Sequence, residues 1–210
     1  NLDRAGVVIA TGIGGIRTLE NEHDIINNKG PRRVSPLFVS KMIPNIAGGH
    51  LSMQFGFRGP SQTIISACAS SNDAIGIALR LIRYGDADII LTGGTEASIT
   101  PLTISGFANM KALSQNCTNP TKASRPFDAD RDGFVLSEGA GILMLESEEH
   151  ALKRNAPILA ELAGYGSTDD AFHITQPAPE GLGANKAMKI ALLDANLLPN
   201  DINYINAHGT

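Results

Sequence analysis

The chain has 210 residues, 42% of them hydrophobic, and is therefore long enough to bury a substantial core. Its formal net charge of −4 at pH 7 argues against nucleic acid as the main partner. No apolar run approaches the roughly 20 residues of a membrane-spanning helix, so we expect a soluble protein without membrane insertion. Two cysteines, Cys68 and Cys117, are too few for a disulfide framework, and we expect both to be reduced in a cytoplasmic chain.

The first part of the chain contains a predicted strand, a glycine turn and a helix. Ala5–Ala10 is predicted to be a strand, and Thr11–Gly15 is a glycine-rich turn behind it. A dinucleotide-binding GxGxxG loop would need glycine where Arg17 stands, so we do not expect a nucleotide site. Phe38–Phe55 has apolar residues at helical spacing and is predicted to be one helix.

The stretch from Ser61 to Glu96 is the one around which the chain is organised. Thr63–Ala67 is rich in β-branched and apolar residues and predicts a buried strand. The helix that follows, to Tyr84, has too many apolar positions for one face, so we expect it to be buried nearly all round. Ala87–Leu91 is a second strand, and this close succession predicts a parallel crossover. Polar residues suited to an N-cap crowd the start of the helix: Ser70, Ser71, Asn72 and Asp73.

Cys68 lies at the corner between the predicted strand and the predicted helix. Free N–H groups at a helix N-terminus favour a thiolate and can hold a developing oxyanion. Cys68 is therefore a candidate nucleophile. The alternative is a small buried hydrophobic residue that happens to lie at an element boundary.

The rest of the chain mixes loops with further elements. Residues 98–116 are ambiguous between a short helix and a segment that lines a pocket. Strands are predicted at 135–146 and 158–165, with a polar helix at 147–155 between them. An amphipathic helix is predicted at 184–197, and a strand at 203–207 ends directly before His208.

An acidic loop imitates the start of a calcium-binding loop. Asp128, Asp130, Asp132 and Gly133 have the expected spacing, but the acid that should supply the bidentate ligand, Glu138, falls one residue early. We therefore expect a local structural role for these acids and no metal site.

A faint internal repeat connects the two ends of the chain. The sequence ISAC at 65–68 corresponds to INAH at 205–208, and each follows a helix and a turn. A duplicated fold would bring both strand ends to the same face and so place the Cys68 thiol near the His208 imidazole. Without such a duplication, His208 would be an ordinary histidine.

Several motifs together resemble the β-ketoacyl-acyl-carrier-protein synthases. They are ACASS at 67–71, GGTEAS at 93–98, PFDADRDGFVLSEGAG at 126–141, DAFHITQPAPEG at 170–181 and NAHGT at 206–210. The resemblance covers essentially the whole chain. Ile13 in the turn ATGIGG further resembles the synthase II branch of the family.

The resemblance implies an α/β, thiolase-like fold layered α-β-α-β-α, incomplete at both ends, that works as a homodimer. Residues 1–155 would form most of the first thiolase-like half, and residues 156–210 the start of the second. The reaction implied is a decarboxylative Claisen condensation that elongates fatty acids. No bound cofactor or metal is implied, because phosphopantetheine is carried by the acyl carrier protein.

The family's functional residues can be carried over where the motifs match. Cys68 would accept the acyl group, and His208 would polarise the malonyl thioester carbonyl. By their residue types alone Arg32 and Arg33 form a solvated basic spot. The further positions implied are Ile13 and Phe107 at the acyl pocket, Thr175 and Thr210 at the pantetheine arm, and Arg32, Arg33 and Lys111 facing the carrier protein.

Three hypotheses about function follow from these observations. The leading one is the carrier-protein-dependent condensing enzyme. The second is a thiolase that uses coenzyme A, and the third is a catalytically incomplete fragment or dimerisation module. The third arises because the chain begins without Met and ends within a motif at Thr210, before the second histidine and the lysine that the resemblance implies.

Overall fold

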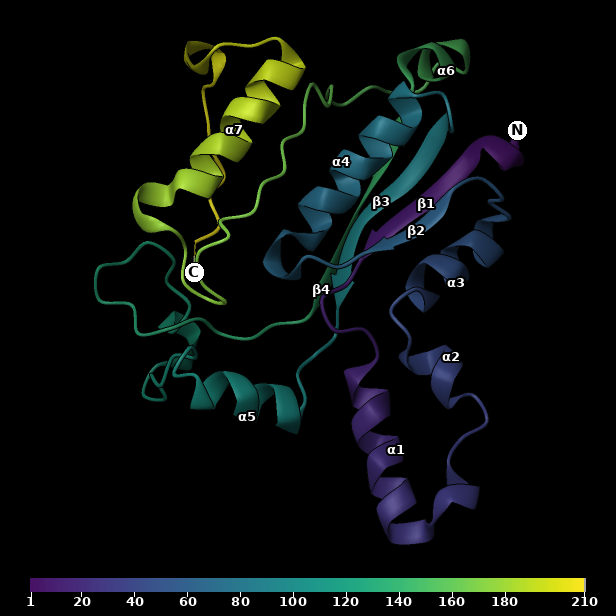
Figure 1. The fold of residues 1–210 in the computed structure, drawn as a ribbon. Helices are drawn as coiled ribbons and strands as arrows, with labels where there is room; N and C mark the ends of the chain where they lie inside the picture. The colour runs from purple at the N-terminus through teal and green to yellow at the C-terminus, as the bar shows by residue number, and fades with distance from the viewer. Residues whose placement is uncertain (210) are drawn as a thin grey trace.

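A computed structural model describes residues 1–209, and its centre is one four-stranded mixed sheet (Figure 1). The strand order is β2-β1-β3-β4. β1 (Ala5–Ala10) is parallel to β2 (Ser61–Ile64) on one side and to β3 (Ile89–Glu96) on the other. β4 (Gly139–Glu146) is antiparallel to β3 along its whole length. The predicted strand at Ala5–Ala10 is confirmed and forms one of the two central strands.

β1 is buried on both faces, which explains its continuous apolar sequence. All six of its residues are buried, and Val7 and Val8 are 0% exposed. Val8 packs in a core cluster with residues of helix α4 (Ser70–Arg83), whereas Val7 faces Gly48 of helix α3 (Ile46–Phe55). Burying a side chain of this size stabilises the fold by about 1.5–3 kcal/mol. The sheet is therefore held between helices on both faces.

The predicted parallel crossover is confirmed, with shifted ends. β2 and β3 both run parallel to β1, which lies between them, and α4 connects the two. β2 ends at Ile64 and β3 begins at Ile89, so the strand limits at Ala67 and Ala87 are wrong. The expectation that α4 is buried nearly all round is also wrong, because Arg80 and Arg83 are exposed and give the helix a polar face.

The predicted helix at Phe38–Phe55 is two helices. α2 (Phe38–Met42) and α3 are separated at Ile43, whose ψ of 139° is extended. Pro44 follows Ile43, and a residue before proline is pushed out of the helical region. The proline therefore divides the helix.

Helices account for most of the remaining regular structure. The ambiguous residues 98–116 contain a helix whose first turn is capped by the Thr100 hydroxyl. The predicted helices at 147–155 and 184–197 are confirmed within a few residues. The helices are α1 (Ile16–Lys29), α5 (Pro101–Asn109), α6 (Glu148–Lys153) and α7 (Leu182–Ala195). None of the helices described is long and apolar enough to cross a membrane.

The segment between α6 and α7 forms a further layer without strand pairing. A strand requires a neighbour for its hydrogen bonds. The segments predicted as strands at Ile158–Tyr165 and Asn203–Ala207 have no pairing partner among residues 1–209, so they are not strands there. Even so, Tyr165 contacts α4 at Gly76, and Gly164 contacts α7. The layers therefore run α3, sheet, α4, extended segment and α7 (Figure 1).

Candidate functional site

Cys68 is at the head of α4, as predicted. β2 ends at Ile64, a short 3-10 turn spans Ala67–Ala69, and α4 begins at Ser70. The Cys68 thiol is free and the residue is exposed. The residue before it, Ala67, has a φ of +50°, a left-handed conformation that costs an alanine roughly 1–2 kcal/mol. Such strain is kept where the surrounding structure holds the backbone in place, and it gathers at functional sites.

The Ser70 hydroxyl holds this turn closed. It accepts a hydrogen bond from the Ser66 N–H at 2.8 Å and donates one to the Ala67 carbonyl at 2.7 Å. Ser70 is 4% exposed, so both bonds are shielded from water. The N-cap expectation is wrong, because the N-cap residue is Ala69 and no side chain caps the helix. Sequence analysis missed the backward bonds of Ser70, although a serine just after a turn commonly makes them.

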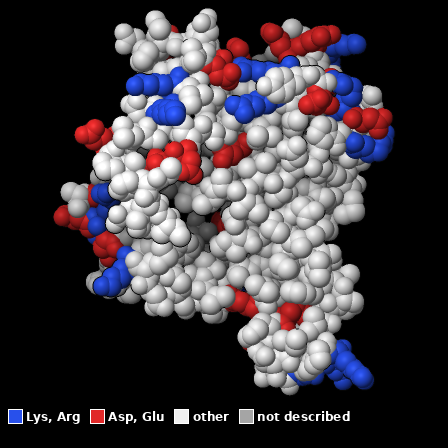
Figure 2. Space-filling model, viewed as in Figure 1, with Lys and Arg blue, Asp and Glu red and all other residues white. Residues whose placement is uncertain are grey.

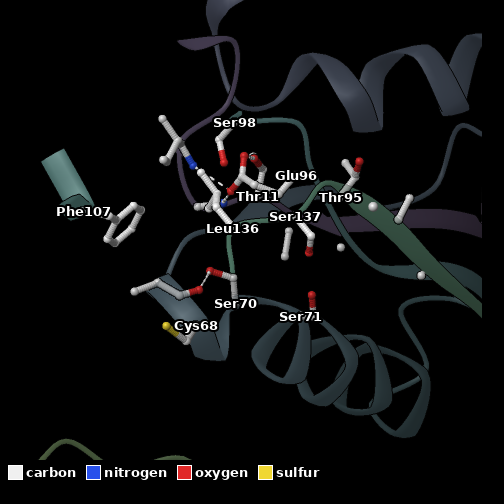
Figure 3. Close-up of a pocket in the computed structure, with 18 residues that line it drawn as sticks. Thr11, Cys68, Ser70, Ser71, Thr95, Glu96, Ser98, Phe107, Leu136 and Ser137 are labelled. Carbon is white, nitrogen blue, oxygen red and sulfur yellow. Dashed lines mark hydrogen bonds between the residues drawn. The ribbon is translucent and has the colours of Figure 1, made fainter. Parts of the chain in front are cut away.

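A first cavity of about 470 Å³ begins at Cys68 and is lined mainly by small and apolar residues. Figure 3 shows the Cys68 sulfur and the Phe107 ring on one side of it, with Glu96 and Thr11 beyond. Ile13 also lines this cavity. Two of the predicted substrate-binding residues, Ile13 and Phe107, therefore share a cavity with the candidate nucleophile.

A second, wider cavity of about 1070 Å³ meets the first at Cys68 and Phe107. Its wall includes His208 and Thr175, so the structure brings the predicted thiol, imidazole and threonine to one space. Thr175 belongs to a loop in which the His173 Nδ1 accepts the Thr175 N–H at 3.1 Å. Figure 2 shows a hollow in this face of the molecule, beside the N-terminal end of α4. Thr210 lies outside the described residues.

The three predicted basic residues lie at two separate places. Arg32 and Arg33 are exposed in a 3-10 turn after α1, a 14-residue helix that carries them roughly 20 Å from the glycine turn. Lys111 is exposed just after α5, next to Met110, which lines the second cavity. Only Lys111 is therefore near the mouth of the candidate site.

A hydrogen-bond network that sequence analysis missed supports the Cys68 turn from the far side. The Asp73 carboxylate accepts hydrogen bonds from the Ser66 hydroxyl and the Tyr165 phenol. Partial burial and the bond to Asp73 raise the pKa of Tyr165, so the phenol stays a donor at neutral pH. Asp73 was predicted only as a cap residue, and no local signal connects it with Tyr165, 92 positions later.

The acidic loop has the structural role that was predicted. The Asp132 carboxylate accepts the Ser114 hydroxyl at 2.6 Å and the Gln115 N–H at 2.9 Å. These two bonds lower the pKa of Asp132. Within the part of the chain that the structure describes, no group of three or more His, Cys, Asp or Glu residues is placed to hold a metal ion.

Comparison with known proteins shows which sequences this chain resembles. The family described as Beta-ketoacyl synthase, N-terminal domain, matches residues 1–151, and its C-terminal domain matches residues 159–210. A 3-oxoacyl-[acyl-carrier-protein] synthase 2 from Staphylococcus aureus is 52% identical over 208 residues, which is 99% of this chain and 51% of the relative. The enzyme of the same name from a Synechocystis species is 50% identical over 210 residues, 100% of this chain and 50% of the relative.

Solved structures show which fold this chain shares. A type II PKS acyl-carrier protein in complex with its ketosynthase bound to the hexaketide gives a TM-score of 0.94 and 38% identity, covering 100% of this chain and 53% of that one. The predicted α/β, thiolase-like fold class is therefore confirmed. The chain spans about half the length of the relatives it matches, and the division of the fold at residues 155 and 156 stays a prediction.

Proposed function

The chain belongs to the β-ketoacyl synthase family, and on that basis we propose that it is the condensing enzyme of fatty acid elongation, with Cys68 as its acyl acceptor. One observation carries the proposal. An exposed thiol at the head of α4 lies where two cavities meet, one lined by Ile13 and Phe107 and the other by Thr175 and His208. This arrangement suits an acyl chain on one side and its thioester carrier on the other.

In the first half-reaction the Cys68 thiolate attacks the carbonyl of an acyl thioester. A new carbon–sulfur bond forms to Cys68, the bond to the phosphopantetheine sulfur breaks, and the released thiolate takes up a proton. The field of the α4 N-terminus favours the attacking thiolate. The product remains a thioester, which is still reactive toward a carbon nucleophile.

In the second half-reaction a malonyl thioester loses carbon dioxide, and its enolate carbon attacks the acyl group on Cys68. The Cys68 thiolate then leaves, and the β-ketoacyl thioester departs on its carrier. We propose that His208 donates a hydrogen bond to the malonyl thioester carbonyl as charge develops there. Thr175, on the wall of the same cavity, and Thr210 would contact the pantetheine arm.

The partner we propose is acyl carrier protein, which brings its own phosphopantetheine, so no bound cofactor or metal enters the mechanism. The exposed cations Arg32, Arg33 and Lys111 suit an acidic carrier surface. A homodimer and a cytoplasmic location complete the proposal, the latter supported by two cysteines that are both free. The two alternatives, a coenzyme A-dependent thiolase and a non-catalytic module, are not favoured, because the relatives are named as acyl-carrier-protein synthases.

The test begins with acyl transfer alone. The protein is incubated with palmitoyl acyl carrier protein, and intact mass with peptide mapping should show one palmitoyl group on Cys68. Cys68→Ser should not be labelled through a thioester, whereas Cys117→Ser, which removes the other exposed thiol, should be labelled like wild type. Labelling that is equal in wild type and Cys68→Ser would refute the nucleophile assignment.

A second measurement separates the two half-reactions. His208→Ala should still be acylated at Cys68 but should release carbon dioxide from malonyl acyl carrier protein at least about 100-fold more slowly. Equal decarboxylation by wild type and His208→Ala would remove His208 from the mechanism. Acylation by palmitoyl-coenzyme A at the same rate as by the carrier protein would favour the thiolase instead.

A further inference from the structure

The glycine turn after β1 is fastened to a carboxylate from another strand. Glu96, the last residue of β3, accepts the Gly12 N–H at 2.7 Å and the Ile13 N–H at 3.2 Å on one oxygen. Its other oxygen accepts the Thr11 hydroxyl at 3.1 Å, and the Thr11 oxygen in turn accepts the Gly14 N–H at 3.1 Å. One carboxylate therefore organises the backbone of the whole turn.

Glu96 also forms part of the wall of the first cavity. A carboxylate beside an apolar space is costly unless hydrogen bonds satisfy its oxygens. Among residues 1–209 no Lys, Arg or His forms an ion pair with it, so the three donors of the turn do this. Figure 3 shows Glu96 beside Thr11 on the cavity wall.

The turn has little freedom to move between its two supports. A Cβ atom on Gly12 would lie 2.9 Å from the Glu96 carboxylate, and one on Gly15 would lie 2.4 Å from the Lys41 carbonyl. The Gly15 N–H also donates to the Met42 carbonyl at 3.0 Å. Ile13 is thus carried by a backbone that is held by Glu96 on one side and by the end of α2 on the other.

We propose that Glu96 is a positioning residue for acyl-chain length: by fixing the turn, it holds Ile13 against the first cavity and so limits the length of chain that the cavity accepts. This inference rests on the proposed function, in which that cavity receives the acyl group of Cys68. Accepting or refusing even one methylene changes selectivity by on the order of 10-fold. A small displacement of Ile13 therefore has a measurable effect.

The experiment measures a ratio. Hexanoyl and palmitoyl acyl carrier protein compete at equal concentration for the protein, and intact mass gives the ratio of the two acyl groups on Cys68. Glu96→Ala releases the turn, so the palmitoyl-to-hexanoyl ratio should rise by about 10-fold. Glu96→Gln keeps an acceptor oxygen for the two N–H groups and should stay within about 2-fold of wild type.

Glu138→Ala is the matched control. Glu138 also accepts a backbone N–H, that of Ile99 at 2.9 Å, but it does not line either cavity. Its removal should leave the ratio unchanged. If Glu96→Ala does not fold, Thr11→Val replaces the hydroxyl of the same turn with a methyl group, which removes its bonds to Glu96 and to the Gly14 N–H, and should shift the ratio in the same direction.

The outcomes distinguish the inference from its premise. If Cys68 of the wild-type protein takes up neither acyl group, the proposed function fails and the inference fails with it. If wild type is acylated and the ratio is the same in Glu96→Ala, with both rates lowered equally, Glu96 only stabilises the fold. A ratio that shifts equally in Glu138→Ala would also overturn the inference.

Discussion

β3 and the extended segment from Ile158 to Tyr165 are two apolar stretches with very different surroundings. β3 pairs with β1 on one side and with β4 on the other, and Ile90 in it is 0% exposed. In the extended segment Leu159 is 96% exposed, and no strand among the described residues pairs with it. The difference teaches that an apolar, β-branched sequence becomes a buried strand only where neighbouring strands complete its hydrogen bonds.

The extended segment is nevertheless anchored, by side chains instead of a backbone ladder. The Tyr165 ring rests on Gly76 of α4, and the Arg80 guanidinium lies 5.1 Å from the ring centroid. On the opposite side, Cβ atoms on Gly164 and Gly166 would collide with the backbone of α7. A few specific contacts therefore hold this segment, whereas β3 is held along its whole length.

The largest expected effect compares two apolar truncations. Ile90→Ala empties part of the closed core and should lower the free energy of unfolding by about 2–5 kcal/mol. Leu159→Ala removes a side chain that is almost fully in water and should change it by less than about 0.5 kcal/mol. Chemical denaturation of both variants measures the difference. A cost above about 2 kcal/mol for Leu159→Ala would mean that the segment is buried in solution, and the contrast would be lost.

The next effect tests whether Tyr165 truly rests on α4. A Cβ atom on Gly76 would lie 2.2 Å from the Tyr165 ring, so Gly76→Ala should destabilise the protein by about 1–3 kcal/mol through overpacking. Were the segment detached, the same change would stabilise α4 by about 0.5–1 kcal/mol, because alanine is the better helix former. The sign of the change in thermal or denaturant stability decides between the two.

The matched control for Gly76 is Gly106, an exposed glycine in α5 with no atom within 4 Å of its Cβ position. Gly106→Ala should be neutral or stabilising by up to about 1 kcal/mol. Adding Tyr165→Ala to Gly76→Ala should remove the overpacking, so the double variant should be less unstable than the sum of the two single changes. Additive losses would contradict a direct contact between Tyr165 and Gly76.

Much of the sheet to which β3 belongs, and of the helices packed on it, could be predicted from local sequence. These strands and helices are close in the chain, and their apolar residues follow clear patterns. Ala5–Ala10 is continuous and apolar, and it is the strand it was predicted to be, while its central place in the sheet is a finding of the structure. Ile158–Tyr165 shows the limit, because pairing depends on partners that its own residues do not specify. Pro44 shows a different limit: its effect on Ile43 was visible in the sequence but was outweighed there by the apolar periodicity.

The candidate site divides in the same way. Cys68 could be found from its position between a strand and a helix. The family resemblance named Phe107, Thr175 and His208, and in the structure each of them lines a cavity that Cys68 also lines. Glu96 could not be assigned its role, because it binds Gly12, 84 positions earlier in the chain. The same holds for the bond between Asp73 and Tyr165, which are 92 positions apart. Bonds of this kind depend on the sheet and on the docking of Tyr165, which no local pattern encodes.

The smallest expected effect concerns pH and the far side of the anchored segment. The Asp194 carboxylate on α7 accepts the Tyr165 N–H at 2.9 Å and the Arg83 guanidinium at 2.9 Å. The bond from the Tyr165 N–H, together with Arg83, holds the pKa of Asp194 below its ordinary value of 3.8. Because the folded-state pKa is the lower one, this contribution is present above pH 4 and is lost as the pH falls through the folded-state value.

Hydrogen exchange of the Tyr165 amide between pH 2.5 and 7, corrected for the exchange rate of an unprotected amide at each pH, measures this loss. The amide of Ile90, buried in the sheet, is the internal reference for opening of the core. Protection of Tyr165 relative to Ile90 should fall several-fold at the acid end, since the pair is solvent-screened and contributes little. Asp194→Asn should show weaker protection throughout and no acid-dependent drop. Asp169→Asn, four residues beyond the extended segment and bonded to the Ala171 N–H, should behave as wild type. An acid-dependent drop that persists in Asp194→Asn would mean that another group fastens the segment, and the side-chain anchoring that distinguishes it from β3 would need a different origin.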